Sequence, residues 1–231
     1  MAKTLLGKLR PAAVGRLKLA RLPADVIEGY RALADLTGTV SDALDECRIA
    51  AAVPGSVLKP TEPRARLVAQ ALTVLNRRRK GRVSKLAEIE AHNLAEPGDV
   101  LVIQGVANIS SMGGVSASVG RRQKEAGAIV DGAVRDIDHS RGIGYPVWSS
   151  SVSPISGKRR IETVAVNKTV KIAGIRVNPG DLVIADEVGV CFVPFKRAAE
   201  VLEVAQRLAK REKGRLAKLA TGVPLSLWLA S

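Results

Sequence analysis

Cysteines and aromatic residues are scarce in this chain of 231 residues. The only two cysteines, Cys47 and Cys191, are too few and too far apart for a disulfide framework or a cysteine-rich zinc site, and this favours a reducing, cytoplasmic setting. Aromatic residues make up 3% of the chain, which argues against a protein that binds single-stranded nucleic acid by stacking bases on aromatic rings. The run 100–120 carries no charge, but it is too rich in serine, glycine and amide side chains to span a membrane.

Acidic residues are also in the minority, since 36 lysines and arginines stand against 22 aspartates and glutamates and give a net charge of +14. A positive field of this size attracts anions such as nucleic acid, acidic proteins and small carboxylates. Residues 1–24 hold six basic side chains and no acid. A transit peptide has this charge pattern but is also rich in serine, and the first serine here is Ser41, so a basic arm packed on the surface is favoured. Residues 25–231 are expected to form one domain.

The apolar pattern predicts an α/β domain whose strands lie in more than one sheet. Helices are expected from Asp25 to about Ala34, from about Thr39 onward, and over 84–94, 115–125, 136–141 and 195–219, the last one long and basic. Strands are expected over 99–104, 127–131, 161–166, 182–185 and 190–193, in a segment that begins at 145–148, and in a tight hairpin around Ala173-Gly174. Residues 66–75 fit a buried strand or a short helix, and the basic segment 77–82 is expected to be a loop.

Several common site motifs are absent from the sequence. There is no phosphate-binding P-loop, and residues 142–144 lack the third glycine of a dinucleotide fingerprint. Residues 114–118 (GVSAS) come close to the nucleophile elbow of serine hydrolases but lack its final glycine. The only two histidines, His92 and His139, have no histidine or cysteine at metal-ligand spacing, and His92 is expected on a helix surface or at an interface. A serine hydrolase is therefore disfavoured.

Residues 127–136 (GAIVDGAVRD) carry the most informative chemistry. An apolar strand is expected to end at the turn dipeptide Asp131-Gly132, with Arg135 and Asp136 side by side after it. In open α/β proteins, ligands bind in the loops that follow the carboxyl ends of strands. An arginine fork matches a carboxylate and an aspartate binds Mg²⁺ or Mn²⁺, so this pair suits a 2-oxo acid. The alternative is a surface ion pair, or Asp136 as a helix cap.

The stretch 110–116 (SSMGGVS) also allows two interpretations. Glycines ahead of a helix leave backbone N–H groups free to bind an anion, with support from the helix dipole. The alternative is a flexible loop without a ligand. Taken alone, this stretch favours the loop.

Five motifs in order resemble the RraA-like family, which includes 4-hydroxy-4-methyl-2-oxoglutarate aldolases and the regulator of ribonuclease E activity. They are DVLVI at 99–103, the Gly-Gly loop at 113–114, GAIVDGAVRD at 127–136, GYPV at 144–147, and PGDLVIADEVGV at 179–190 followed by Val193-Pro194. The segment TVSDAL at 39–44 and the apolar segment 66–74 resemble the N-terminal half of the family. The likeness covers roughly residues 37–210.

This resemblance implies a swivelling β/β/α fold with mixed sheets, flanked by the basic arm and the long C-terminal helix. It also implies a homotrimeric ring or a hexamer with its site between subunits. In aldolase members the backbone of the Gly-Gly loop holds pyruvate, the arginine binds substrate, the aspartate binds the divalent metal, and an acid reaches in from the neighbouring subunit. The matching positions here are Gly113, Gly114, Val115 and Ser116 for pyruvate, then Arg135, Asp136 and Glu187. Many aldolase members carry an acid that helps order metal-bound water where this chain has Gly114.

The sequence thus favours a cytoplasmic lyase that uses Mg²⁺ or Mn²⁺ and acts on a 2-oxo acid. Retro-aldol cleavage of a 4-hydroxy-2-oxo acid and decarboxylation of oxaloacetate share a pyruvate enolate, whose charge the metal and Arg135 would stabilise. One alternative is a non-catalytic regulator of the ribonuclease-regulator type, with an acidic protein as its partner. Another is a nucleic acid-binding protein that uses residues 77–82, residues 158–160 and the C-terminal helix.

Overall fold

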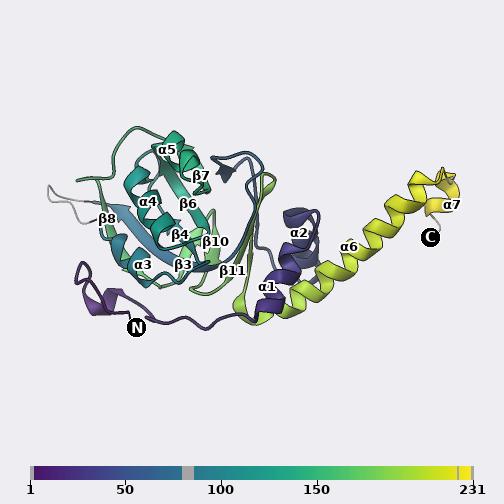
Figure 1. Cartoon of the computed structure of the whole chain (residues 1–231), viewed down its shortest axis with the longest axis horizontal. Helices are drawn as coiled ribbons and strands as arrows, with labels where there is room; N and C mark the ends of the chain where they lie inside the picture. The colour runs from purple at the N-terminus through teal and green to yellow at the C-terminus, as the bar shows by residue number, and fades with distance from the viewer. Residues whose placement is uncertain (1–2, 80–85, 223, 230–231) are drawn as a thin grey trace.

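The computed structural model describes residues 3–79, 86–222 and 224–229, and its centre is a ten-stranded mixed sheet surrounded by helices (Figure 1). The strand order is β1-β12-β11-β3-β4-β6-β7-β2, with β5 beside β6 and β8 beside β3, while β9 and β10 form a separate hairpin. The strands are β1 (Ala52–Pro54), β2 (Lys59–Pro60), β3 (Leu67–Arg78), β4 (Val100–Gln104), β5 (Ser110–Met112), β6 (Gly127–Val134), β7 (Val147–Val152), β8 (Ile161–Val166), β9 (Val170–Ile172), β10 (Ile175–Val177), β11 (Leu182–Ala185) and β12 (Gly189–Val193). The α-helices are α1 (Ala24–Arg31), α2 (Leu36–Glu46), α3 (Ile89–Leu94), α4 (Gly114–Arg122), α5 (Ile137–Gly142), α6 (Ala198–Ala220) and α7 (Leu225–Leu229).

Strand β3 joins the two halves of the large sheet. Its first residues pair antiparallel with β11, its middle residues pair parallel with β4, and its last residues pair antiparallel with β8. One strand can serve three neighbours because it is 12 residues long, so that β11, β4 and β8 each pair with a different part of it. Residues 67–74 of this strand are all buried. The segment 66–75 is therefore a strand, and the short-helix alternative is wrong.

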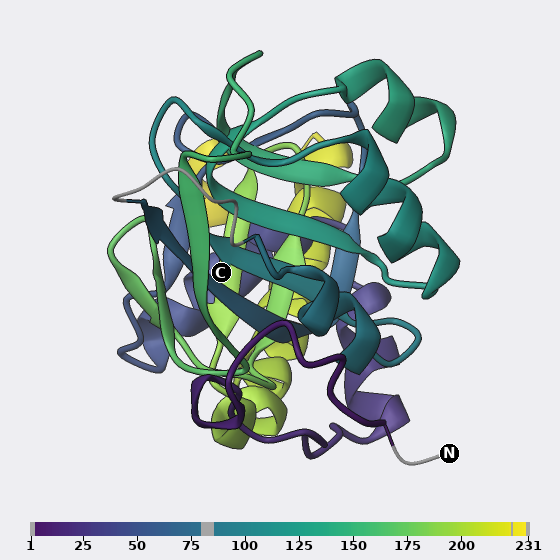
Figure 2. The same cartoon turned by 90° about the vertical axis from the view of Figure 1, so that its left-hand side faces the viewer.

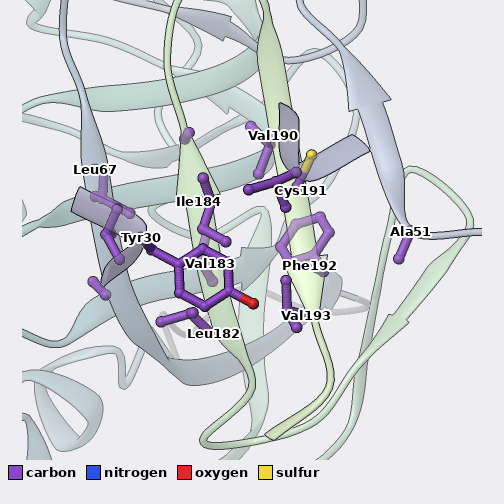
Figure 3. Close-up of a cluster of buried hydrophobic side chains, with 14 of the residues drawn as sticks. Tyr30, Ala51, Leu67, Leu182, Val183, Ile184, Val190, Cys191, Phe192 and Val193 are labelled. Carbon is purple, nitrogen blue, oxygen red and sulfur yellow. The ribbon is translucent and has the colours of Figure 1, made fainter. Parts of the chain in front are cut away.

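Two apolar cores lie on opposite faces of this sheet. Successive residues of β4 alternate between them, with Val100 and Val102 in the larger core and Leu101 and Ile103 in the smaller one. The larger core packs α1, α2 and α6 against β3, β11 and β12, and Figure 3 shows the Tyr30 ring beside the last two strands. Burial raises the pKa of this phenol, which donates to a backbone carbonyl of α6 (2.8 Å). The smaller core packs α3 and α4 against β4 and β6.

The long helix α6 packs on the body only near its start. Its buried residues lie between Ala198 and Ala205 and contact α1 and α2, and beyond them the helix extends away from the sheet toward α7 (Figure 1). Near the far end the Arg215 guanidinium lies 4.5 Å from the centre of the Trp228 ring. The long helix expected over 195–219 is confirmed, with a 3₁₀ turn at Phe195–Arg197 ahead of it. Of the helices in the described part of the chain, none has the length and apolar character that crossing a membrane requires.

The N-terminal arm lies against the surface of the body (Figure 2). The Leu6 and Lys8 N–H groups donate to the buried carboxylate of Glu90 in α3 (2.9 and 2.6 Å). Further along, the Arg21 guanidinium pairs with the buried Asp99 carboxylate, whose hydrogen bond raises the pKa of the guanidinium. The arm is therefore held at both of these points.

The expected strands are largely present, whereas two helix starts differ from the prediction. The strands expected over 99–104, 161–166, 182–185 and 190–193 correspond to β4, β8, β11 and β12. Both residues of the Ala173-Gly174 turn have positive φ (46° and 87°), as this tight hairpin requires. Helix α2 begins at Leu36 rather than Thr39, and α1 runs from Ala24 to Arg31 rather than from Asp25 to about Ala34.

The structure around the expected basic loop differs from the prediction in two respects. Arg77 and Arg78 belong to β3, where they pair with β8, so the strand continues two residues into the predicted loop. Residues 86–88 are not helical, so the helix expected over 84–94 is shortened to α3. Residues 80–82 of the loop, and residues 84 and 85 of the predicted helix, lie outside the described residues.

Strand β6 continues through the expected turn at Asp131-Gly132 and ends at Val134, so this turn prediction is wrong. The register with β7 is irregular at this dipeptide, which indicates a bulge within a continuing strand. Gly132 is needed for a close backbone approach, because a Cβ atom there would lie 2.9 Å from the Val106 nitrogen. The strand therefore runs up to the residue before Arg135.

Asp186 ties the turn between β11 and β12 to α2. Its carboxylate accepts hydrogen bonds from the Thr37 N–H (3.0 Å), the Thr37 hydroxyl (2.6 Å) and the Val188 N–H (2.8 Å). Its backbone carbonyl accepts a hydrogen bond from the indole of the buried Trp148 (2.7 Å). Both Thr37 and Asp186 are buried, so the two Thr37 donors depend on this carboxylate for an acceptor.

We expect Asp186→Ala to lower the free energy of unfolding by at least about 2 kcal/mol, because two buried donors lose a charged acceptor. Denaturant unfolding followed by circular dichroism measures this change. The matched control is Asp138→Ala, whose carboxylate is fully exposed and which should change stability by less than about 0.5 kcal/mol. Equal stability of the two variants would show that the Asp186 contacts do not hold the turn.

Candidate functional site

The candidate site lies where β5 and β6 end side by side. These strands are parallel neighbours, and the Arg135 N–H donates to the Met112 carbonyl (3.1 Å) at their ends. The residues that follow Met112 are Gly113 and helix α4, and the residues that follow Arg135 are Asp136 and helix α5. Helices α4 and α5 pack against each other (Figure 1). The fold therefore brings the Gly-Gly loop and the Arg-Asp pair, some 20 residues apart in the sequence, to one place.

The Asp136 carboxylate points across to the Gly-Gly loop. Asp136 occupies the N-cap position of α5 but makes no capping hydrogen bond with that helix. Its Oδ2 atom instead accepts the Gly114 N–H (2.8 Å) and lies 3.4 Å from the Arg135 Nε. Its backbone is left-handed (φ 55°), a conformation that a non-glycine residue adopts only when its surroundings hold it there. Asp136 thus stands at the start of α5 and beside Arg135, as the alternative expects, but its carboxylate contacts the Gly-Gly loop and does not cap the helix.

Gly113 leaves open the space above the Arg-Asp pair. A Cβ atom at this position would lie 2.8 Å from the Asp136 Oδ2 and 3.1 Å from the Arg135 Nε. Any side chain here would displace one of these groups or fill the space in front of them. The glycine is thus a geometric requirement of the site.

The Asp136 carboxylate fits a divalent cation such as Mg²⁺. Its side chain is 41% exposed, and within the described residues no donor hydrogen-bonds its Oδ1 atom. Mg²⁺ is commonly held by one or two carboxylates, with water and substrate oxygens completing its shell. The described part of the chain holds no cluster of three or more histidine, cysteine or acidic side chains, so a cage made only of protein ligands is not what this site offers. Asp136 suits a site that shares the cation with a ligand.

A cavity of about 330 Å³ opens in front of these groups. The Gly-Gly loop and the start of α4 form one wall, Arg135 and Asp136 form another, and α3 and the segment before β8 close the sides. Two cations, Arg135 and Lys158, face this space. Glu88 lines it as well, and burial raises the pKa of its carboxyl. The cavity therefore suits a small anion.

The start of α4 adds backbone donors to this cavity. The first intrahelical bond runs from the Ala117 N–H to the Gly113 carbonyl (3.0 Å), so the three preceding N–H groups have no acceptor within the helix. The Gly114 N–H is used by Asp136, which leaves the N–H groups of Val115 and Ser116 at the cavity wall. N–H groups at a helix start, with the helix dipole behind them, bind anions.

A chain of buried polar side chains runs from the cavity into the core, and sequence reasoning missed it. The Ser116 Oγ lies 2.9 Å from the His92 Nε2, and the His92 Nδ1 lies 2.8 Å from the Glu125 Oε1. The Tyr145 hydroxyl donates to the other Glu125 oxygen (2.7 Å). His92 is 1% exposed, so its expected place on a helix surface or at an interface is wrong in this chain. No signal in the sequence pairs these residues, because they lie on separate elements.

The second histidine also contacts a serine of α4. The Ser118 Oγ lies 2.7 Å from the His139 Nε2, on the exposed side of the helix and outside the 330 Å³ cavity. The segment 114–118 that resembles a nucleophile elbow therefore carries two serine–histidine pairs. Only the Ser116 pair faces the cavity and has a buried carboxylate behind it.

Glu187 lies apart from the other site residues predicted from the sequence. It is exposed on the turn between β11 and β12 and does not line the cavity formed by this chain. Its neighbour Asp186 is used within the fold, as described above. Within one chain, the structure thus brings together Gly113, Gly114, Val115, Ser116, Arg135 and Asp136 but not Glu187.

Two known proteins are similar in sequence to most of this chain. The chain is 29% identical over 196 residues to protein DlpA of Legionella pneumophila, covering 80% of this chain but 30% of DlpA. It is 27% identical over 199 residues to a Halalkalibacterium halodurans protein provisionally named 4-hydroxy-4-methyl-2-oxoglutarate aldolase, covering 85% of this chain and 90% of the relative.

Solved structures share the fold. A crystal structure of an uncharacterised protein from Pseudomonas syringae pv. tomato superposes with a TM-score of 0.82 at 26% identity, covering 92% of this chain and 96% of the other. Streptomyces coelicolor RraAS2, described as an unusual member of the RNase ES inhibitor RraA protein family, superposes with a TM-score of 0.75 at 25% identity, covering 85% of this chain and 98% of the other. These neighbours confirm the expected mixed α/β domain with its long C-terminal helix.

The family model described as Aldolase/RraA matches residues 37–192, which is more than half of the chain. The matched range contains the Gly-Gly loop, the Arg-Asp pair and the turn that carries Glu187. The chain belongs to the RraA-like family.

Proposed function

We propose that this protein is a carbon–carbon lyase that acts on 2-oxo acids and forms pyruvate through its enolate. The observation that carries the proposal is the meeting of Arg135, Asp136 and the free N–H groups of α4 at one small cavity. A 2-oxo acid places a carboxylate and a keto oxygen on adjacent carbons, which suits a site with several donors and one cation ligand. The relative provisionally named as an aldolase supports the same chemistry.

Different residues of the chain bind different parts of the substrate. The Arg135 guanidinium supplies a planar pair of N–H donors for a carboxylate or a developing enolate oxygen. The Val115 and Ser116 N–H groups bind the other end of the anion from the start of α4. Asp136 would hold Mg²⁺ or Mn²⁺, and this cation would polarise the keto oxygen of the bound acid. Retro-aldol cleavage of a 4-hydroxy-2-oxo acid and decarboxylation of oxaloacetate both fit this arrangement.

A second candidate function is regulation of a nuclease without catalysis. RraAS2, a solved neighbour, belongs to a family of ribonuclease inhibitors, and Gly114 adds no acidic side chain to the cavity. The fold also brings two basic runs together, because the end of β3 pairs with the start of β8 and the Arg79 N–H donates to the Arg160 carbonyl (2.8 Å). This edge would suit an acidic protein or nucleic acid partner. Metal-dependent release of pyruvate separates the two candidates, because only the lyase produces it.

We expect the protein to release pyruvate from at least one member of a panel of 4-hydroxy-2-oxo acids and oxaloacetate, in an assay coupled to lactate dehydrogenase. A chelator should abolish the activity and added Mg²⁺ or Mn²⁺ should restore it. Asp136→Ala should lose both the activity and the binding of Mn²⁺ while keeping its circular dichroism spectrum. If Asp136→Ala binds Mn²⁺ as tightly as wild type, Asp136 does not hold the metal.

Arg135→Lys should lower kcat/KM by at least about tenfold. Lysine keeps the positive charge but lacks the planar fork, and a charge-assisted hydrogen bond contributes about 1.5–3 kcal/mol. Steady-state kinetics on the best substrate of the panel measures the loss. Turnover near that of wild type would remove Arg135 from the binding role.

We further propose that the protein works as a homotrimer or hexamer in which Glu187 completes a neighbour's site, since this exposed acid lies away from its own cavity. Glu187→Gln should then lose about 10–100-fold in activity, as is typical of groups that orient a metal's surroundings. Mixing Glu187→Gln with Arg135→Ala under conditions of subunit exchange should restore a fraction of the activity. A stable monomer of 24.4 kDa in light scattering, or proven exchange without recovery, would contradict the shared site.

A further inference from the structure

We infer that Ser116, His92 and Glu125 form a proton relay, in which the Ser116 hydroxyl exchanges a proton with carbon C3 of the bound 2-oxo acid. His92 and Glu125 are positioning residues that move the proton to and from this hydroxyl. The inference rests on the proposed lyase function and assigns proton transfer to residues that the family resemblance does not assign to it.

The relay is continuous and almost fully shielded from water. Its contacts are 2.9 Å from Ser116 to His92 and 2.8 Å from His92 to Glu125, and the exposed fractions of the three residues are 8%, 1% and 5%. Burying an imidazole and a carboxylate is costly, and apolar residues of similar size would fill a structural core at no such cost. Clusters of this kind are concentrated at functional sites.

The order of atoms along the chain suits proton transfer. With the Nδ1–H of His92 donated to Glu125, its Nε2 is free to accept a proton from the Ser116 hydroxyl and to return it. The Tyr145 hydroxyl holds the far oxygen of Glu125, and burial beside that carboxylate raises the pKa of Tyr145, so this phenol remains a donor. The same arrangement of hydroxyl, imidazole and carboxylate activates a hydroxyl in hydrolases, where it is recognised by geometry rather than by sequence order.

The relay ends at the substrate cavity. Ser116 and His92 both line it, and the Ser116 N–H is one of the free donors proposed to bind the anion. A ligand held by that N–H therefore lies beside the hydroxyl of the same residue. Glu88, which also lines the cavity and has a raised pKa, is the competing proton carrier in this space.

In the cleavage direction, the proton that is taken from the substrate hydroxyl is returned to the product at C3. The proton of the 4-hydroxyl group passes through Ser116 to the His92 Nε2. The C3–C4 bond then breaks, so that C4 becomes a carbonyl carbon and the electron pair of the bond passes into the C2–C3 enolate. The Ser116 hydroxyl then gives its proton to C3 as the C2 ketone reforms, and the His92 Nε2–H restores the hydroxyl. For oxaloacetate, carbon dioxide leaves with no proton removed, the Ser116 hydroxyl gives its proton to C3, and a proton from solvent restores the Ser116 hydroxyl.

The experiment measures exchange of the pyruvate methyl protons for deuterium in D₂O with Mg²⁺, followed by proton NMR, because this exchange needs only proton transfer at C3. We expect Ser116→Ala and His92→Gln to slow the exchange by at least about 100-fold, the low end of general acid–base contributions. The dissociation constant of pyruvate, measured by calorimetry, should stay within about threefold, since the backbone donors and Arg135 remain. The matched control is Ser118→Ala, the same substitution on the same helix at a serine that also contacts a histidine but faces away from the cavity.

The outcomes separate this inference from the proposed function. If wild type neither exchanges the methyl protons nor releases pyruvate from any substrate, the lyase proposal fails and the relay fails with it. If wild type exchanges but Ser116→Ala and His92→Gln do so at the same rate, or if they lose pyruvate affinity in proportion to exchange, the relay alone is wrong. If Glu88→Gln stops exchange while Ser116→Ala does not, Glu88 carries the proton. Should His92→Gln fail to fold, Ser116→Ala, which removes a single oxygen atom, decides the matter.

Discussion

The long strand β3, whose residues 67–74 are buried, is the constraint on which the rest of the structure depends. The strand is antiparallel to β11, parallel to β4 and antiparallel to β8, so it fixes both the part of the sheet that carries the Glu187 turn and the part that carries the site. Its side chains also enter both apolar cores, with Ala71 in one and Leu72 in the other. The two cores on opposite faces of the sheet then anchor different helices, with α1, α2 and α6 on one face and α3 and α4 on the other. The candidate site belongs to the second group.

The geometry of the site follows from two parallel strands that end together. The pairing of β5 with β6 sets Gly113 against Asp136, and the hydrogen bond from the Gly114 N–H fixes the carboxylate in that place. These contacts offset the conformational free energy that a left-handed backbone costs at Asp136. Gly113 has no side chain, so the space in front of the carboxylate stays open. The Asp136 carboxylate, the Arg135 guanidinium and the helix N–H groups thus converge without any long loop. The site is built on the ends of rigid elements, which is where precise binding geometry is easiest to maintain.

Two clusters of buried polar side chains differ in where their hydrogen bonds lead. Asp186 has its carboxylate oxygens satisfied by donors of its own fold and holds a turn in place. Glu125 and His92 are satisfied as well, but their chain of hydrogen bonds ends at a hydroxyl on a cavity wall. The first arrangement explains stability, and the second provides a path for a proton.

The sequence by itself determined the elements whose signals are local. These signals depend on residues that are close together in the chain. They are the apolar runs of β4, β11 and β12, the positive-φ turn at Ala173-Gly174, the apolar stripe of α6 and the adjacency of Arg135 and Asp136. The order of the motifs was enough to indicate the family.

Tertiary structure alone decided the features that depend on distant neighbours. Asp131-Gly132 stays in a strand because β4 and β7 pair with β6 on both sides, and the glycine is needed for close packing rather than for a turn. His92 lies 24 positions before Ser116 and 33 positions before Glu125 in the sequence. Only the packing of α3 against α4 and the segment that follows α4 brings these residues into hydrogen-bonding range. A local pattern carries no information about such a contact, because the energy that forms it comes from burying apolar faces of separate elements against one another.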